Sequence, residues 1–155
     1  MEIITSVSNQ LIKDINLLKQ KKRRIEKQEF ILEGKHLVEE AYKNNVLLVV
    51  LSTDKTYLEN YKNVRTVQVS DTIIEKLSST KTPQSVIGVA KMQENNLIKS
   101  DRYVVLDGVN DPGNLGTIIR TSLAFGINNL ILSNNTVDAY NEKVIRATQG
   151  AIFKA

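Results

Sequence analysis

Arg120 is the residue whose side chain could act most directly on a bound ligand. It lies 14 residues beyond an apolar run of strand type, Val104 to Leu106, and open α/β sheets usually bind ligands beyond the carboxyl ends of their strands. A guanidinium group stays protonated in proteins. We therefore expect Arg120 to hold an anion or stabilise a developing negative charge, in preference to abstracting a proton as a base. An amphipathic helix with one solvated arginine explains the same pattern, and the spacing alone leaves both interpretations open.

The segment around Arg120 must supply a tight turn and then a helix. Residues 110–113, NDPG, form the turn, because glycine tolerates positive φ and proline fixes its own φ. Asn114 is expected to cap the helix, and Gly126 is expected to end it in the left-handed conformation. On a helical wheel, Arg120 lies outside the apolar stripe. That stripe consists of Leu115, Ile118, Ile119, Ser122 and Leu123.

The same segment carries a long motif. Residues 107–126 read D-x-V-x-D-P-x-N-x-G-x-I-x-R-T-x-x-A-F-G, which closely resembles the first motif of the SpoU (TrmH-like) family of RNA ribose 2′-O-methyltransferases in the SPOUT class. Residues 141–153, NEKVIRATQGAIF, resemble the second motif of that family. Residues 4–15, ITSVSNQLIKDI, and 30–41, FILEGKHLVEEA, resemble its N-terminal RNA-binding domain. The resemblance covers nearly the whole chain.

The resemblance implies both a fold and a reaction. The fold is α/β, with an N-terminal L30e-like RNA-binding domain over residues 1–95, followed by the first part of a SPOUT (α/β-knot, Rossmann-like) domain over residues 101–155. The reaction is transfer of a methyl group from S-adenosylmethionine to a ribose 2′-hydroxyl, without a metal. The expected substrate is ribosomal RNA, with transfer RNA as the second choice. In the family, the arginine matching Arg120 is held to activate that hydroxyl, and the asparagine matching Asn114 lies in the same site. A homodimer is implied for the full-length parent.

The third motif of the family, a glycine and glutamate loop before an asparagine-containing segment, is expected beyond Ala155, together with the cofactor-binding residues and the knot. We therefore expect this chain to be a truncated, inactive fragment that binds S-adenosylmethionine weakly or not at all. The alternative is a non-catalytic L30e-like RNA-binding module. A third motif in the reading frame beyond Ala155 would favour the methyltransferase over the RNA-binding module.

Positive charge is concentrated near the N-terminus. The formal net charge is +4 and the pI is near 9.2. Six basic residues fall within nine positions, and we predict that they contact RNA: Lys19, Lys21, Lys22, Arg23, Arg24 and Lys27. A solvated helix end is the alternative, because cations also favour the negative end of a helix dipole. Lys143 and Arg146, one turn apart in the second motif, are expected to contact RNA or shape the site, or else to be solvated.

Several classes of site are excluded or disfavoured. The chain has no cysteine, which excludes disulfides and thiolate metal sites, and its single histidine, His36, has no clustered partners for zinc. Asp107 and Asp111 are expected to fix their loop by hydrogen bonds to backbone amides. The glycines of the first motif do not form G-x-G-x-x-G, which argues against a dinucleotide site.

The remaining pattern alternates strands with helices, which predicts an α/β layer structure. Strands are predicted at 30–32, 46–51, 66–69, 85–90, 104–106 and 129–132, with a last strand beginning at 151–153. Helices are predicted after Asn9 and over 37–44, 57–61, 70–77 and 142–148, and the polar residues 92–100 read as a linker. No apolar run approaches the roughly 20 residues of a membrane span, and we expect a soluble, cytoplasmic protein with no membrane partner.

Overall fold

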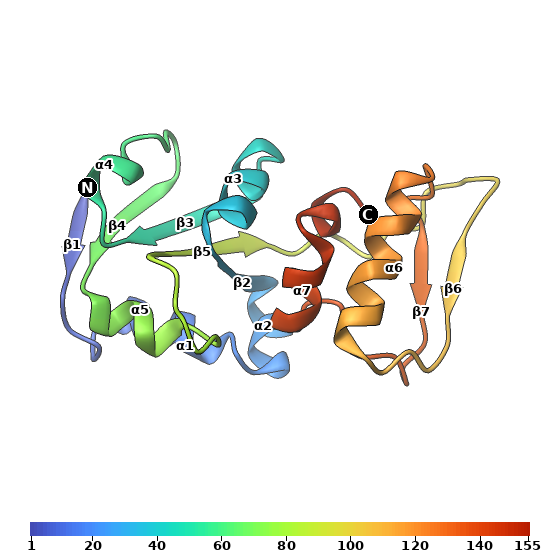
Figure 1. Cartoon of the computed structure of the whole chain (residues 1–155), viewed down its shortest axis with the longest axis horizontal. Coiled ribbons are helices and arrows are strands. Elements are labelled where there is room, and N and C mark those ends of the chain that lie inside the picture. Colours follow the sequence, from blue (N-terminus) through green and yellow to red (C-terminus); the bar gives the residue numbers. More distant parts are fainter. The chain divides into compact units, whose positions relative to one another are not determined.

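The chain folds into two units in the computed structural model, which describes all 155 residues (Figure 1). Unit 1 comprises Met1–Met92 and unit 2 comprises Gln93–Ala155. None of the helices is long and apolar enough to cross a membrane.

Unit 1 is built on one mixed sheet of five strands. In spatial order these are β1 (Glu2–Ile4), β4 (Arg65–Val69), β3 (Leu47–Ser52), β5 (Val86–Lys91) and β2 (Glu29–Glu33). β1, β4 and β3 pair in parallel, whereas β5 runs antiparallel to both β3 and β2. The first four strands in the sequence therefore begin at one edge of the sheet, and β5 ends at that same edge.

Helices cover both faces of this sheet. Figure 1 shows α1 and α5 on one side and α3 and α4 on the other. Ile12, Ile15 and Ile73 from α1 and α5 pack on Val67 and Ile87 of the strands to form a continuous buried cluster. The helices of unit 1 are α1 (Gln10–Leu17), α2 (Lys21–Lys27), α3 (Lys35–Lys43), α4 (Lys55–Leu58) and α5 (Asp71–Leu77).

Most elements of unit 1 match the sequence prediction within a few residues, although β1 was not predicted. The helices α1 and α5 begin at side-chain caps. Asn9 accepts a hydrogen bond from the Leu11 N–H at 2.9 Å, and Ser70 accepts one from the Ile73 N–H at 3.4 Å. The basic cluster is the main difference. No separate helix was predicted over these residues, but α1 ends at Leu17 and residues 21–27 form a helix of their own, α2. The chain turns there because Arg24 folds back onto the end of α1.

Unit 2 contains a parallel pair of strands, β6 (Val104–Leu106) and β7 (Leu130–Leu132), joined by the crossover helix α6 (Pro112–Ala124). Helix α7 (Glu142–Thr148) follows and packs against α6. The predicted end of α6 is confirmed, since Gly126 has φ of +75° just beyond its C-cap. The start of α6 was predicted wrongly, because the helix begins at Pro112 and its cap is Asp111 rather than Asn114.

The predicted strand at 151–153 is also wrong. Ala151–Phe153 form a 3₁₀ turn, η1, after Gly150 at φ of +93°. All three side chains are buried, and the turn packs against α6 and α7. Three consecutive apolar residues fit such a turn because a strand would direct the middle one to the opposite face.

Candidate functional site

The loops after β6 and β7 lie side by side at the carboxyl ends of the two strands. The Ser133 N–H donates to the Leu106 carbonyl at 2.9 Å, and the Val137 N–H donates to the Val109 carbonyl at 2.9 Å. The Gly108 N–H also donates to Ser133 Oγ at 3.1 Å. These bonds hold both loops at the edge where open α/β sheets bind ligands.

Asp111 connects the first of these loops to α6. Its carboxylate accepts a hydrogen bond from the Asn114 N–H at 2.8 Å, which satisfies one of the free amides at the start of the helix. The expectation that Asp111 fixes the loop through a backbone amide is therefore confirmed. The Asn114 side chain is released from the capping role and lies on the exposed surface of the first turn.

Arg120 and Asn114 both lie on the solvent-exposed face of α6 but do not adjoin one another. They are six residues apart in sequence, which corresponds to about 9 Å along the helix axis and about 120° around it. Asn114 is close to the loops at the carboxyl ends of the strands, whereas Arg120 lies further along the helix. The rest of this exposed face is small or polar, consisting of Gly113, Thr117, Thr121 and Ala124.

The second predicted pair lies on α7. Asn141 caps this helix by accepting a hydrogen bond from the Lys143 N–H at 2.9 Å. Lys143 is exposed and Arg146, one turn later, is half-buried. Only the first of these two cations is fully presented to solvent.

Five of the six cations in the basic cluster of unit 1 are exposed, and one is buried. Lys21, Lys22, Arg23 and Lys27 are exposed on α2, with Arg23 paired to Glu26 at 3.0 Å. Lys19 is exposed, but its ammonium group donates to the Lys76 carbonyl at 2.7 Å, next to the end of α5.

Arg24 is the exception in this cluster, with only 5% of its surface exposed. Its guanidinium donates to the Leu18 and Lys19 carbonyls, each at 3.0 Å, at the C-terminal end of α1. Arg24 therefore joins α1 to α2, and solvent reaches its charge far less than the other five. The sequence does not distinguish it, because burial depends on how the two helices meet.

Sequence reasoning did not single out Ser133 and Thr136. The Thr136 hydroxyl donates to the Leu106 carbonyl at 3.2 Å and lies 3.2 Å from Ser133 Oγ, so both side chains organise the carboxyl edge of β6 and β7. The available signal was a polar run directly after a strand, which ordinary turns share. No group of three or more His, Cys, Asp or Glu side chains is placed to hold a metal ion.

Two family matches cover most of the chain. Residues 9–88 match the MRM3-like substrate binding domain. Residues 101–155 match the SpoU rRNA Methylase family. The boundary between them falls near the division between units 1 and 2.

Individual relatives agree with these matches. The chain is 36% identical to the 23S rRNA (guanosine(2553)-2′-O)-methyltransferase RlmP of Bacillus subtilis, over 99% of the chain and 63% of that protein. It is 28% identical to rRNA methyltransferase 3, mitochondrial, of Xenopus tropicalis, over 93% of the chain and 38% of that protein. The AdoMet-bound rRNA methyltransferase of Sinorhizobium meliloti superposes with a TM-score of 0.83 at 32% identity, covering 98% of this chain and 62% of that one. The chain thus spans less than two thirds of the length of these relatives.

Proposed function

The chain belongs to the SpoU rRNA methylase family, and we propose that its protein methylates a ribose 2′-hydroxyl of RNA with S-adenosylmethionine as the methyl donor. One observation carries the proposal: residues 101–155 match the methylase family and directly follow a substrate-binding match over residues 9–88. The names of the relatives support ribosomal RNA as the substrate, ahead of transfer RNA.

Arg120 is the proposed group that stabilises the reacting oxygen. Methyl transfer to a hydroxyl is an in-line displacement, so the protein must orient the oxygen and stabilise the negative charge that develops on it. The guanidinium of Arg120 is exposed on α6 and is therefore accessible to an RNA ribose and its phosphate. Asn114 is proposed to lie in the same site, nearer the loops after β6 and β7.

We propose that the cofactor binds beside the carboxyl edge of β6 and β7, where open α/β sheets usually bind ligands. Gly108 has φ of +72°, and a β-carbon there would meet no atom within 4 Å, so the loop borders open space. Asp107 and Asn110 are the exposed polar side chains of that loop, and we propose that they border the cofactor. S-adenosylmethionine supplies the methyl group when it is bound.

Unit 1 is the proposed RNA-binding part. The exposed cations Lys21, Lys22, Arg23 and Lys27 gather on one short helix, which suits contact with phosphates. Lys19 lies beside this helix, and Arg24 contributes by holding it in place. Lys143 and Arg146 of α7 are proposed to add RNA contacts in unit 2.

We also propose that the full-length protein is a homodimer and that it is located in the cytoplasm. Phe125, at the end of α6, is 72% exposed, and Val105 and Ile131 form an exposed apolar pair on neighbouring strands. Exposed apolar groups of this kind often mark contact surfaces between proteins. An RNA substrate agrees with a cytoplasmic location.

The test is transfer of a labelled methyl group from S-adenosylmethionine to ribosomal RNA by the full-length protein. The phosphodiester bond that resists alkaline hydrolysis is then mapped, because it marks a 2′-O-methylated ribose. We expect a single 2′-O-methylated nucleotide. RNA binding without any methyl transfer would instead favour a non-catalytic RNA-binding protein, and sedimentation of the same sample would test the dimer.

A further inference from the structure

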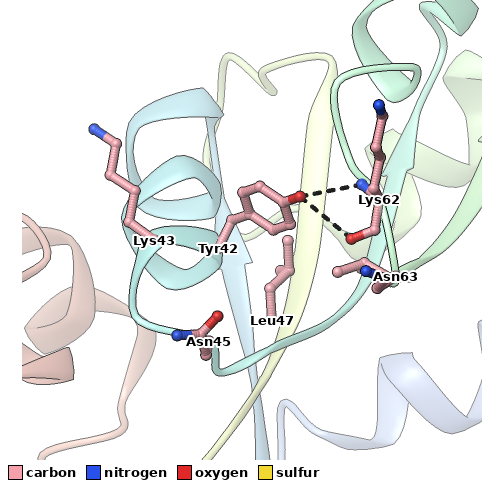
Figure 2. Close-up of a pocket in the computed structure, with 7 residues that line it drawn as sticks. Tyr42, Lys43, Asn45, Leu47, Lys62 and Asn63 are labelled. Carbon is pink, nitrogen blue, oxygen red and sulfur yellow. Dashed lines mark hydrogen bonds between the residues drawn. The ribbon is translucent and has the colours of Figure 1, made fainter.

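Unit 1 contains a pocket at the edge of its sheet where β3 and β4 begin (Figure 2). Its volume is about 390 Å³, which lies in the range of small-ligand sites. One wall comes from the end of α3 and the turn after it, and the other from the loop before β4. The lining residues are Tyr42, Lys43, Asn45, Leu47, Lys62, Asn63 and Val64.

The two walls are fastened to each other by Tyr42. Its hydroxyl accepts a hydrogen bond from the Lys62 N–H and donates one to the Lys62 carbonyl, both at 3.2 Å (Figure 2). The ring also packs edge to face against Tyr61, with 5.0 Å between the ring centroids. Helix α3 and the loop before β4 are thereby held together without a ligand, so the pocket is already formed.

The lining combines the groups that recognise an unpaired nucleotide. Asn45 and Asn63 offer amides with both donors and acceptors, which can bond a base edge. Leu47 and the Tyr42 ring supply an apolar surface for the base. Lys43 and Lys62 extend from the rim rather than into the pocket, where they could meet phosphates (Figure 2).

Further cations continue from the pocket along the same edge. Lys91 ends β5, and its N–H donates to the Val46 carbonyl at 2.8 Å, directly before Leu47 of the pocket. Lys91 lies opposite Glu29 of β2 in the sheet. Glu29 follows Lys27, the last residue of the basic helix α2, by two positions. From β4 to β2 the edge spans three strand spacings, or about 14 Å.

Three cations along this edge form no ion pair, although Glu29 lies opposite Lys91 in the sheet. Lys43 pairs with Glu40 at 3.5 Å. In contrast, Lys27, Lys62 and Lys91 are exposed and have no carboxylate within 4.0 Å. A run of unpaired ammonium groups attracts a polyanion and releases its counterions on binding.

We propose that an unpaired RNA nucleotide occupies this pocket and that the adjoining phosphates follow Lys62, Lys91 and Lys27 towards α2. The inference rests on the proposed function, in which RNA is the substrate, and adds where a single-stranded segment binds. The chain leaves unit 1 at this edge, since β5 ends at Lys91 and unit 2 begins at Gln93. The opposite edge of the sheet is a strand length, about 17–20 Å, from this point of the chain.

The pocket amides are tested by replacing Asn45 and Asn63 together with glycine. Both residues have positive φ, 58° and 63°, which glycine adopts without strain, so the change removes the amides but preserves the turns. The probes are an RNA hairpin with an unpaired loop and a fully paired duplex, with affinity measured by fluorescence anisotropy. We expect about tenfold weaker hairpin binding, equivalent to the loss of two or three hydrogen bonds, and unchanged duplex binding. Unchanged hairpin binding would overturn the inference.

The phosphate path is tested with Lys62→Gln and Lys91→Gln. For a single strand, each lost contact should reduce the slope of log affinity against log salt by about 0.7. Lys55→Gln is the matched control, because Lys55 is exposed at the opposite edge of the sheet and should leave the slope unchanged. Equal effects at Lys55 and Lys62 would overturn the path. RNA binding that depends on α2 but not on the pocket would reject this inference alone, whereas no RNA binding by the unmodified protein would reject the proposed function as well.

Discussion

Gly116 of α6 packs directly against Ala147 of α7, so closely that a β-carbon on the glycine would overlap the alanine side chain. That β-carbon would also lie 2.9 Å from the Val144 carbonyl oxygen, which belongs to rigid helix backbone. The glycine of the first motif therefore sets how closely the helix carrying Arg120 approaches the helix carrying Lys143 and Arg146.

Gly116→Ala is expected to destabilise unit 2 by about 1–3 kcal/mol through overpacking, even though alanine favours a helix by about 1 kcal/mol. Hydrogen exchange of the α6 amides in the whole chain measures this. The double variant with Ala147→Gly should recover part of the loss, because the overlap with the Ala147 side chain is removed while the contact with the Val144 carbonyl remains. Independent, additive effects of the two substitutions would contradict the contact.

Asp111→Ala should destabilise unit 2 by about 1 kcal/mol, because the first turn of α6 loses its side-chain cap. Asp111→Asn should retain most of the stability. Asn114→Ala is the matched control, because the Asn114 side chain is exposed and does not cap the helix. It should change the free energy of unfolding by no more than about 0.5 kcal/mol. A larger loss at Asn114 than at Asp111 would restore the capping role to Asn114.

The cations of α2 and the buried Arg24 should behave differently. Changing Lys21, Lys22 and Arg23 together to glutamine should weaken RNA binding and flatten its salt dependence without affecting folding. Arg24→Gln should instead lower stability by about 1–3 kcal/mol, because the Leu18 and Lys19 carbonyls lose their donor. Anisotropy titrations over a salt series measure the effect on RNA binding, and urea unfolding measures the effect on stability. A triple variant that binds RNA as tightly as the unmodified protein would remove α2 from the RNA contact.

Arg120→Ala is expected to reduce methyl transfer in the full-length protein by about 100 to 1,000-fold, the usual cost of losing one preorganised donor to a developing charge. Because Arg120 is exposed, the free energy of unfolding should change by only about 0.5 kcal/mol. Arg120→Lys should rescue poorly, since an ammonium group cannot reproduce the planar paired hydrogen bonds of a guanidinium. Near-normal single-turnover methylation by the alanine variant would return α6 to a structural role.

Unit 1 should lose stability in alkali through Tyr57 and Tyr61, whose hydroxyls are hydrogen-bonded to each other. Burial raises the pKa of both phenols above the ordinary value of about 10. The folded protein therefore keeps protons that the unfolded chain releases. Their contribution is fully present below about pH 10 and is lost as the pH rises towards the folded pKa.

Urea unfolding at a series of pH values from 8 to about 11 tests this pair. The double variant Tyr57→Phe, Tyr61→Phe should show a shallower loss of stability above about pH 10 than the unmodified chain. Parallel curves for the two proteins would show that other groups govern alkaline unfolding.

The amino-acid sequence by itself determined most of the elements and their order, but not β1, α2 or the 3₁₀ turn at 151–153. Alternating apolar runs and caps such as Asn9 and Ser70 act locally, so strands and helices could be predicted within a few residues. The motif around Arg120 was equally readable, because residue types and spacing define it. The fold class and the family follow from these local signals.

Tertiary structure decided which side chains are available for function. Arg24 is indistinguishable from its basic neighbours in the sequence, yet the meeting of α1 and α2 buries it. The pocket beside Tyr42 joins residues 20 positions apart in the chain. Such contacts depend on how elements pack, and local sequence patterns carry no information about them.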